Sequence, residues 1–342
     1  MAPEGGQGEA QDRSPLVAIV GPTASGKTQA AIELAERLRA EVVSVDSMVV
    51  YRGMDVGTAK PTSEQRARVP HHLLDVAEPG ETFSVAAYQV LAADAVLDIR
   101  RRGSTPLLVG GSGLYFRAVV DGLAFPGTDS RIREALEREA AAAGPLALHH
   151  RLGLLDPGAA GRIEPRNARR TVRALEVAAL TGRPFSTFSS DWNRYPHHRV
   201  RAAGVELAPQ VLRARIEARV RAMMAGGLLD EVRELVDRGL GPSLTASQAI
   251  GYAEMAWYLA GRMSLEDAVR SIVRRTRSLA RRQLAWFRRD PRIAWFSVGR
   301  DGAVEAVDEI ERYLRTGVIR AADTMYGAGA RPASGAVAPT RG

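Results

Sequence analysis

Short apolar runs alternate along the chain with longer stretches of amphipathic sequence. The runs are bounded by Gly, Pro or polar residues and predict buried strands at 16–20, 42–45, 106–109, 204–207 and 293–298. Between them, apolar residues recur at helical spacing, for example over 27–39, 85–101 and 264–289. This alternation predicts an α/β fold, in which a parallel sheet is covered by helices on both faces.

Residues 125–190 break this alternation. The segment SRIREALEREAAAAG (130–144) predicts a helix that has Ser130 as its N-cap and ends at Gly144-Pro145. Two more helical stretches follow without a strand, so we expect a helical insertion domain at 125–190 within a core of 15–124 and 191–319. The ends of the chain, 1–14 and 320–342, are rich in Gly, Ala and Pro without periodicity, which predicts disordered tails.

The segment GPTASGKT follows the first predicted strand and precedes the first predicted helix. Its form, G-x-x-x-x-G-K-T, predicts in this context a phosphate-binding P-loop and a P-loop NTPase-like sheet. Glycines let successive backbone N–H groups turn inward, the lysine supplies a compact charge, and the threonine can ligate Mg²⁺. The candidate phosphate ligands are Gly21, Pro22, Thr23, Ala24, Ser25, Gly26, Lys27 and Thr28, with Thr28 as the candidate metal ligand.

Composition supports this motif and excludes several other classes of site. Lysine occurs only at positions 27 and 60, and all other basic residues except histidine are arginine, so the P-loop keeps lysine in an arginine-rich chain. Cysteine is absent, which excludes disulfides, thiolate zinc sites and cysteine nucleophiles. The six histidines form three adjacent pairs without metal-binding spacing. Because neither a membrane span nor a signal peptide is visible, we expect a cytoplasmic protein.

The net charge of +8 is concentrated in two arginine clusters, at 162–173 and 270–289. If the second cluster is helical, five of its arginines share one face: Arg270, Arg274, Arg277, Arg281 and Arg288. Two such clusters in a P-loop protein favour a polyanion such as RNA as the partner. Each cluster alone could equally be a solvated basic face.

The acidic residue that a kinase needs is absent from its usual place. A kinase usually has an acid that binds the nucleotide's Mg²⁺ at the end of an apolar strand, but the strand 106–109 runs into GGSGLY. Asp46 instead follows the strand 42–45, at the sheet edge where ligands bind, and could accept a proton from a nucleophile or merely cap the next turn. The glycines of GGSGLY could form a tight turn or admit a large substrate.

Seven motifs occur together and in one order: GPTASGKT (21–28), SVDSMVVYRGMDVGTAKP (44–61), PHHLLD (70–75), GGSGLYF (110–116), RALEV (173–177), AIGYAEM (249–255) and RRQLAWFRR (281–289). In this respect the chain, from about residue 15 to about residue 298, resembles the bacterial tRNA dimethylallyltransferases, also called tRNA isopentenyltransferases. The resemblance implies Mg²⁺-dependent transfer of a dimethylallyl group from dimethylallyl diphosphate to N6 of the adenine beside the anticodon. The P-loop would then hold the diphosphate of the prenyl donor.

The resemblance also assigns roles to individual residues. It implies that Asp46 is the general base and that Thr23 and Arg219 flank the diphosphate, although the sequence alone also allows Arg219 to be a surface arginine of a helix over 209–224. It implies contacts with the tRNA anticodon stem-loop at Asp46, Ser47, Met48, Val49, Ser112, Arg133, Arg169, Arg170, Arg173, Gln248, Gly251, Tyr252, Arg281, Arg282, Gln283 and Arg288. Trp286 and Phe287 could stack on bases, but aromatic residues at helical spacing are more often core.

Three positions depart from the family pattern, and none of them is a proposed catalytic group. Val49 stands where many members have Gln, Pro165-Arg166-Asn167 replaces Pro-Asn-Asp, and Ser112 replaces Thr while keeping the hydroxyl. Nothing in the pattern requires more than a monomer. Three rival functions stay open: a small-molecule kinase that uses ATP, an RNA-binding P-loop protein without catalysis, and a prenyltransferase for free adenine nucleotides.

Overall fold

The computed structural model describes residues 14–241 and 246–318, which divide into two compact units. The first unit comprises the residues up to 82, 94–113 and those from 200 onward, and the second comprises 83–93 and 114–199. The predicted insertion, 125–190, lies wholly within the second unit. Apart from Ser14, the predicted tails lie outside the described residues.

A six-stranded parallel sheet forms the centre of the first unit. Its order is β3-β2-β4-β1-β5-β6, where the strands are β1 (Leu16–Val20), β2 (Ala40–Ser44), β3 (His71–His72), β4 (Thr105–Gly110), β5 (Val200–Leu207) and β6 (Ile293–Val298). Five of these strands were predicted from apolar runs, and β3, a two-residue edge strand paired with β2, was not. The four strands β2, β4, β1 and β5 are almost continuously buried because both faces of the sheet are covered.

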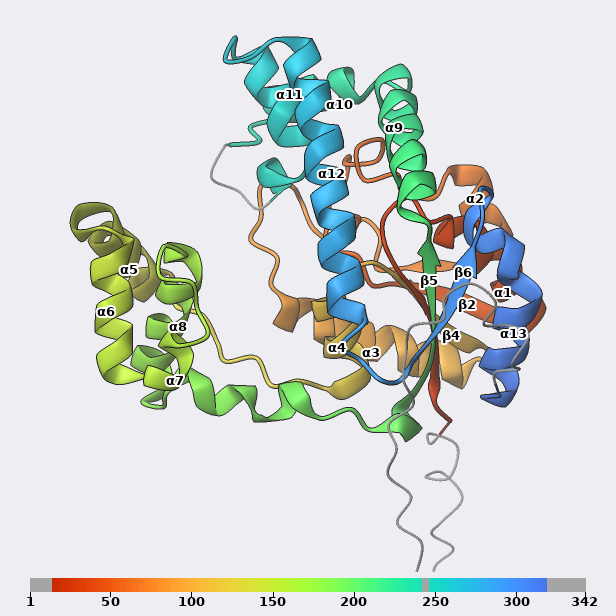
Figure 1. Ribbon diagram of the computed structural model, residues 1–342, viewed down its shortest axis with the longest axis horizontal. Helices are drawn as coiled ribbons and strands as arrows, with labels where there is room; N and C mark the ends of the chain where they lie inside the picture. Colours follow the sequence, from red (N-terminus) through yellow and green to blue (C-terminus); the bar gives the residue numbers. More distant parts are fainter. Residues whose placement is uncertain (1–13, 242–245, 319–342) are drawn as a thin grey trace, which may run out of the picture. The chain divides into compact units, whose positions relative to one another are not determined.

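Helices cover both faces of this sheet, as Figure 1 shows. The helices of the first unit are α1 (Lys27–Leu38), α2 (Ser63–Arg68), α9 (Pro209–Ala225), α10 (Leu228–Asp237), α11 (Tyr252–Leu259), α12 (Leu265–Phe287) and α13 (Val307–Thr316), with the 3-10 helices η4 (Ala246–Gln248) and η5 (Gly302–Ala306). The helix α3 (Val85–Arg101) begins in the second unit and ends in the first. Helices α1 and α13 cover one face, and α12 lies on the other side (Figure 1). The chain reverses its direction across the sheet after β3, so right-handed crossovers place α1 and the helices that connect β5 to β6 on opposite faces.

The main core lies between the sheet and α1 and α13. Alternate strand residues such as Ile19, Leu107 and Val205 are fully buried there, together with Ile32 of α1 and Ile310 of α13. Side chains alternate between the two faces of a strand, so the intervening residues pack on the opposite face. This core fixes the carboxyl ends of β1, β2 and β4 at one edge of the sheet.

The second unit is helical and has its own hydrophobic core. Its elements are α4 (Gly113–Asp121), α5 (Ser130–Ala143), α6 (Pro145–Leu155), α7 (Pro157–Ala160), α8 (Ala168–Thr181), η2 (Phe185–Asn193) and η3 (His197–Arg199). Leu136, Leu152 and Leu175 pack together at its centre. The predicted N-cap of α5 was wrong by one residue, because the Asp129 side chain accepts hydrogen bonds from two backbone N–H groups while Ser130 is already helical.

No helix within residues 14–241 and 246–318 is both long and apolar enough to span a lipid bilayer.

Candidate active site

The P-loop connects β1 to α1 at the carboxyl edge of the sheet. Gly21 has φ of 149°, and a Cβ atom on it would lie 2.6 Å from the backbone oxygen of Val205 in β5, so only glycine fits. Gly26 has φ of 86° and directly precedes the first residue of α1. The first turn of α1 therefore presents its unpaired N–H groups and its partial positive charge to the loop, as expected for an anion site.

Lys27 lies buried beneath the loop. Its Nζ donates to the Pro22 oxygen at 2.5 Å and to the Ser25 Oγ at 3.2 Å, both of which are neutral. Burial, and then the positive charge of Arg219, lower the pKa of the Lys27 ammonium to about 7, against the opposing effect of Asp46. An anion bound in the loop would supply the missing negative partner and favour the charged amine.

Asp46 follows β2 at the same edge. Its Oδ1 accepts a hydrogen bond from the backbone N–H of Met48 at 2.9 Å, so the carboxylate does cap the following turn. It also lines the cavity that contains Lys27 and Thr28. The two interpretations of the sequence are therefore compatible, because one oxygen caps the turn and the carboxylate still faces the cavity.

Arg219 reaches this cavity from α9. Its Nη2 donates to the backbone oxygen of Thr58 at 3.1 Å. Burial lowers the pKa of the guanidinium, and the charge of Asp46 acts in the opposite direction. Arg219 is thus brought into the cavity beside Lys27 rather than lying as a surface arginine of α9.

Two cavities meet around these groups. The smaller, of about 90 Å³, contains Lys27 and Thr28. The larger, of about 360 Å³, extends from the same place along α12. Both are lined by Thr23, Asp46, Thr58, Gly111, Arg219 and Gln283. A small anionic group in the first cavity and a larger substrate in the second would therefore meet next to Asp46 and Arg219.

The glycines after β4 bring this loop close to α12. A Cβ atom on Gly111 would clash with the amide of Gln283, and one on Gly113 would clash with the indole of Trp286. The Gln283 Oε1 in turn accepts a hydrogen bond from the Thr23 N–H at 2.8 Å, which joins α12 to the P-loop. The small residues of GGSGLY thus admit a helix of the protein itself.

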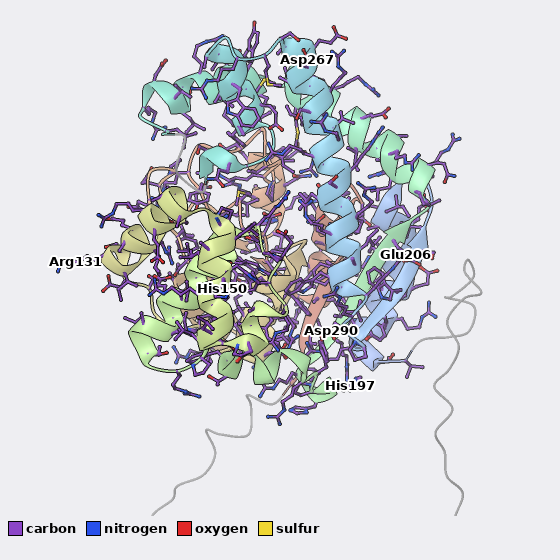
Figure 2. The ribbon with its side chains drawn as sticks, turned by 60° about the vertical axis from the view of Figure 1, so that its left-hand side comes forward. Arg131, His150, His197, Glu206, Asp267 and Asp290 are labelled. Carbon is purple, nitrogen blue, oxygen red and sulfur yellow. The ribbon has the colours of Figure 1, made fainter. Side chains whose placement is uncertain are left out.

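Helix α12 presents different arginines to two different spaces. Arg275, Arg282 and Gln283 line the larger site cavity. The predicted arginine face was correct as a helical face, but four of its five members line a separate groove of about 1080 Å³, here called the arginine groove, whose basic residues are Arg213, Arg274, Arg277, Arg281 and Arg288. The fifth member, Arg270, pairs with Glu266 and Asp267. Figure 2 labels Asp267 and Asp290 at the two ends of α12 and Glu206 to one side of it. Glu206 lines the arginine groove and pairs with Arg288 at 2.8 Å.

The other residues that the resemblance implied for tRNA contact have varied surroundings. Ser47, Met48, Ser112 and Gln248 line the larger cavity, and Val49 lines the smaller one. Tyr252 is fully buried beside Gly251, which has φ of 99°, and its hydroxyl donates to Glu231, so its side chain does not face the cavity. Phe287 is core, whereas Trp286 is half-buried against the loop after β4.

In the second unit, the predicted arginines divide between an internal pair and an exposed pair. Arg133 and Arg173 both donate to the buried carboxylate of Glu176, each at 2.8 Å. Burial opposes but does not prevent a lowered pKa of Glu176, because both arginines hydrogen-bond to its charged form. Arg169 and Arg170 are exposed in the first turn of α8.

Some groups that shape the site were not predicted from the sequence. Thr58, which holds Arg219, stands in the D-x-G-T-A-K segment but acts through its backbone oxygen, a group that every residue has. For Mg²⁺, the site offers the Thr28 hydroxyl and the Asp46 carboxylate, which are hard oxygen ligands of the kind that Mg²⁺ uses together with substrate phosphates. Within the described parts of the chain, no cluster of three or more His, Asp or Glu residues forms a metal site by itself.

Comparison with known proteins places this geometry in a family. Residues 49–290 match the family model described as IPP transferase, and residues 14–79 match the model described as isopentenyl transferase. A tRNA dimethylallyltransferase of Nocardioides sp. is 50% identical over 294 residues, which are 86% of this chain and 94% of that protein.

Solved structures with a similar fold come from the same kind of enzyme. The full-length tRNA isopentenylpyrophosphate transferase of Bacillus halodurans aligns with a TM-score of 0.65 at 43% identity, over 88% of this chain and 96% of that one. A eukaryotic dimethylallyltransferase acting on tRNA aligns with a TM-score of 0.73 at 25% identity, over 89% of this chain and 80% of that one. The predicted P-loop NTPase-like parallel sheet with helices on both faces is confirmed.

Proposed function

We propose that this chain, which belongs to the IPP transferase family, transfers a dimethylallyl group from dimethylallyl diphosphate to N6 of the adenine beside the anticodon. Its membership of the family makes it a prenyl-transferring enzyme that modifies tRNA. The observation that supports this proposal most directly is the meeting of the two cavities. A cationic phosphate pocket and a wider cavity share Asp46, Thr23 and Arg219. A donor diphosphate and an acceptor base therefore have separate places on either side of one carboxylate.

The P-loop side of the site would bind the leaving group. As the bond between the allylic carbon and the diphosphate oxygen breaks, negative charge grows on that oxygen. This charge can be stabilised by the N–H groups at the start of α1, the Lys27 ammonium and the Arg219 guanidinium. Their stabilisation lowers the barrier only to the extent that it is stronger in the transition state than in the bound substrate. Mg²⁺ held by the diphosphate and the Thr28 hydroxyl would add further charge neutralisation.

Asp46 would act on the acceptor. The N6 amine of adenine is a weak nucleophile because its lone pair is delocalised into the ring. It forms the new C–N bond and loses one proton, and Asp46 is positioned to receive that proton. The hydrogen bond that the Asp46 Oδ1 accepts from the Met48 N–H fixes the carboxylate in orientation.

We further propose how the tRNA is held. The target base would leave its stack and enter the larger cavity, at a cost of a few kcal/mol. Ser47, Ser112 and Gln248 line this cavity and can hydrogen-bond to a base, while Arg282 lies where it can meet a phosphate. The exposed arginines 169 and 170 of the helical unit would contact the anticodon stem-loop. We expect the enzyme to act as a monomer in the cytoplasm, where tRNA is found.

The test uses the purified protein with Mg²⁺ and labelled dimethylallyl diphosphate, and offers either unmodified tRNA or AMP. The variant Asp46→Asn keeps an oxygen that can accept from the Met48 N–H but cannot act as a base, so it separates turn capping from catalysis. We expect label to enter tRNA and not AMP, and the variant to lose about 10²–10⁴-fold in rate while still binding tRNA.

Other results would replace the proposal with one of its rivals. Label in AMP would indicate a prenyltransferase for free nucleotides. Consumption of ATP without prenyl transfer would indicate a kinase. Full activity of the Asp46→Asn variant would show that another group takes the proton.

A further inference from the structure

A loop beside the active site is anchored by one carboxylate from α10. The Glu231 Oε2 accepts hydrogen bonds from the backbone N–H groups of Asp55 at 2.9 Å and Val56 at 2.7 Å. Its Oε1 accepts from the N–H of Gly57 at 3.2 Å and from the Tyr252 hydroxyl at 2.5 Å. Three consecutive N–H groups that converge on one anion form a backbone nest, and hydrogen bonds to a charged acceptor are the stronger kind.

Packing around this anchor leaves the loop little freedom. A Cβ atom on Gly57 would clash with the ring of Tyr252, so the loop lies directly on that ring. Tyr252 is fully buried, and burial together with the charge of Glu231 raises the pKa of its hydroxyl, which therefore stays a hydrogen-bond donor. The loop is held between a carboxylate and an aromatic ring.

The two ends of the loop, Asp55 and Lys60, are also bonded to each other, which couples the positions of the residues between them. The backbone N–H of Lys60 donates to the Asp55 oxygen at 3.1 Å, and the Lys60 Nζ binds the Asp55 Oδ1 at 2.6 Å. The same Nζ binds Asp75 at 2.5 Å. A shift at the anchored residues 55–57 would consequently be passed to Thr58 and Ala59, which lie inside this ring.

Thr58 and Ala59 are the part of the loop that reaches the site. Both line the smaller cavity, together with Lys27. The Thr58 backbone oxygen accepts from Nη2 of Arg219 at 3.1 Å. A long, rotamer-rich side chain such as arginine needs this kind of second contact to stay in one orientation.

We propose that Glu231 is a positioning residue for the transfer reaction: it holds the 55–58 loop so that the Thr58 oxygen keeps the Arg219 guanidinium directed at the donor's diphosphate. This inference rests on the proposed function, specifically on Arg219 as a ligand of the diphosphate. Helix α10 itself is fixed by the buried residues Leu228, Val232 and Leu235, independently of the Glu231 carboxylate. Glu231 thus acts on the loop and leaves the docking of its helix to these apolar side chains.

The test measures steady-state kinetics of Glu231→Gln with each substrate varied in turn. The amide keeps the size of the side chain but removes the charge and one of the two acceptor oxygens. We expect kcat/KM for the donor to fall about 10- to 100-fold, as for a misplacement of about 1 Å, while KM for tRNA changes less than about twofold. Glu234→Gln, an exposed glutamate one turn further along α10, is the matched control and should change neither value.

A double-mutant cycle with Arg219→Ala tests the route of the effect. If Glu231 acts through Arg219, the Glu231→Gln substitution has no further effect on the donor constants once Arg219 has been removed. Tyr252→Phe removes one of the four hydrogen bonds and keeps the ring, so it should lower donor kcat/KM in the same direction by about two- to fivefold. This milder variant keeps the test decisive if Glu231→Gln folds poorly.

The outcomes are distinguishable. A lowered melting temperature with unchanged donor constants, in both Glu231→Gln and Tyr252→Phe, would show a purely structural role and overturn the inference. Equal losses from Glu231→Gln with and without Arg219 would show that the loop acts by another route. If Arg219→Ala alone leaves the donor KM and kcat unchanged, the assignment of Arg219 in the proposed function is wrong, and this inference fails with it for a separately visible reason.

Discussion

The lowered pKa of Lys27 predicts how donor binding depends on pH. The amine is buried among neutral oxygens and close to Arg219, which lower its pKa to about 7 in the free protein. Only the charged amine pairs with a diphosphate, so the observed dissociation constant is the intrinsic one divided by the charged fraction. This fraction falls about 10-fold from pH 6 to pH 8 and about 100-fold from pH 6 to pH 9, and donor binding should weaken in the same proportion.

Calorimetry of donor binding without tRNA provides the assay. Donor phosphates are expected to complete their ionisation near pH 6, so above about pH 7.5 a proton taken up on binding comes to the protein. We expect uptake of nearly one proton at pH 8, measured as a difference in binding enthalpy between buffers with different ionisation enthalpies. Lys27→Met should bind weakly and without this proton uptake. A wild-type affinity that stays constant from pH 7 to pH 9, or equal uptake in Lys27→Met, would refute the reasoning.

The same group makes a signed contribution to folding stability. The pKa of Lys27 is about 7 in the folded protein and 10.5 ordinarily, so between these values the unfolded chain binds more protons than the folded one. The free energy of unfolding therefore rises with pH across this window, as far as this group determines it. Bound diphosphate should reduce this dependence, because it favours the charged amine in the folded state.

Three further predictions concern other parts of the molecule. Gly113→Ala forces a methyl group into the α12 tryptophan and should lower the free energy of unfolding by about 1–3 kcal/mol, whereas Gly80→Ala, at an open position, should change it by less than about 0.5 kcal/mol in the same denaturant titration. Arg282→Ala should raise KM for tRNA about 10-fold, and Arg281→Ala, which changes the arginine groove instead, less than about twofold; equal effects would contradict the assignment of the two arginines to different spaces. Glu176→Gln should lower the free energy of unfolding by about 1–3 kcal/mol at pH 7, because it breaks the pairing with two arginines. Burial raises the pKa of Glu176, but hydrogen bonds from these arginines lower it by more, so in acid unfolding the difference between variant and wild type should close as the pH falls below about 4.

Much of the fold could be predicted because its strands are short, apolar and bounded by turn residues. The strands β1 and β6 begin and end where the apolar runs do. Strand β5 begins at Val200, four residues before the predicted start, because its first half contains a charged residue and small alanines that are buried only by neighbouring strands. Strand β3 consists of two histidines at the sheet edge, which is too short for any periodic signal.

In the site, too, residues with a local sequence signal could be predicted, whereas roles that depend on tertiary contacts could not. The P-loop and Asp46 could be placed from the sequence because each stands at the end of a strand, and parallel strands bring their carboxyl ends together. Helical spacing correctly grouped the α12 arginines on one face but could not show which cavity that face meets. The roles of Thr58 and Glu231 depend on a backbone oxygen and on a nest of N–H groups, which leave no mark in the side-chain pattern.

The chain's sparing use of lysine has a consequence for chemical labelling. Its two lysines, Lys27 and Lys60, are only 9% and 7% exposed, and Lys60 is held by Asp55 and Asp75. A reagent that attacks neutral amines thus meets no open lysine side chain, and burial, which lowers the pKa of Lys27 to about 7, leaves a large share of that amine neutral at pH 7 in the closed pocket. Acylation of Lys27 would then report the breathing of a single phosphate pocket, without any engineered probe.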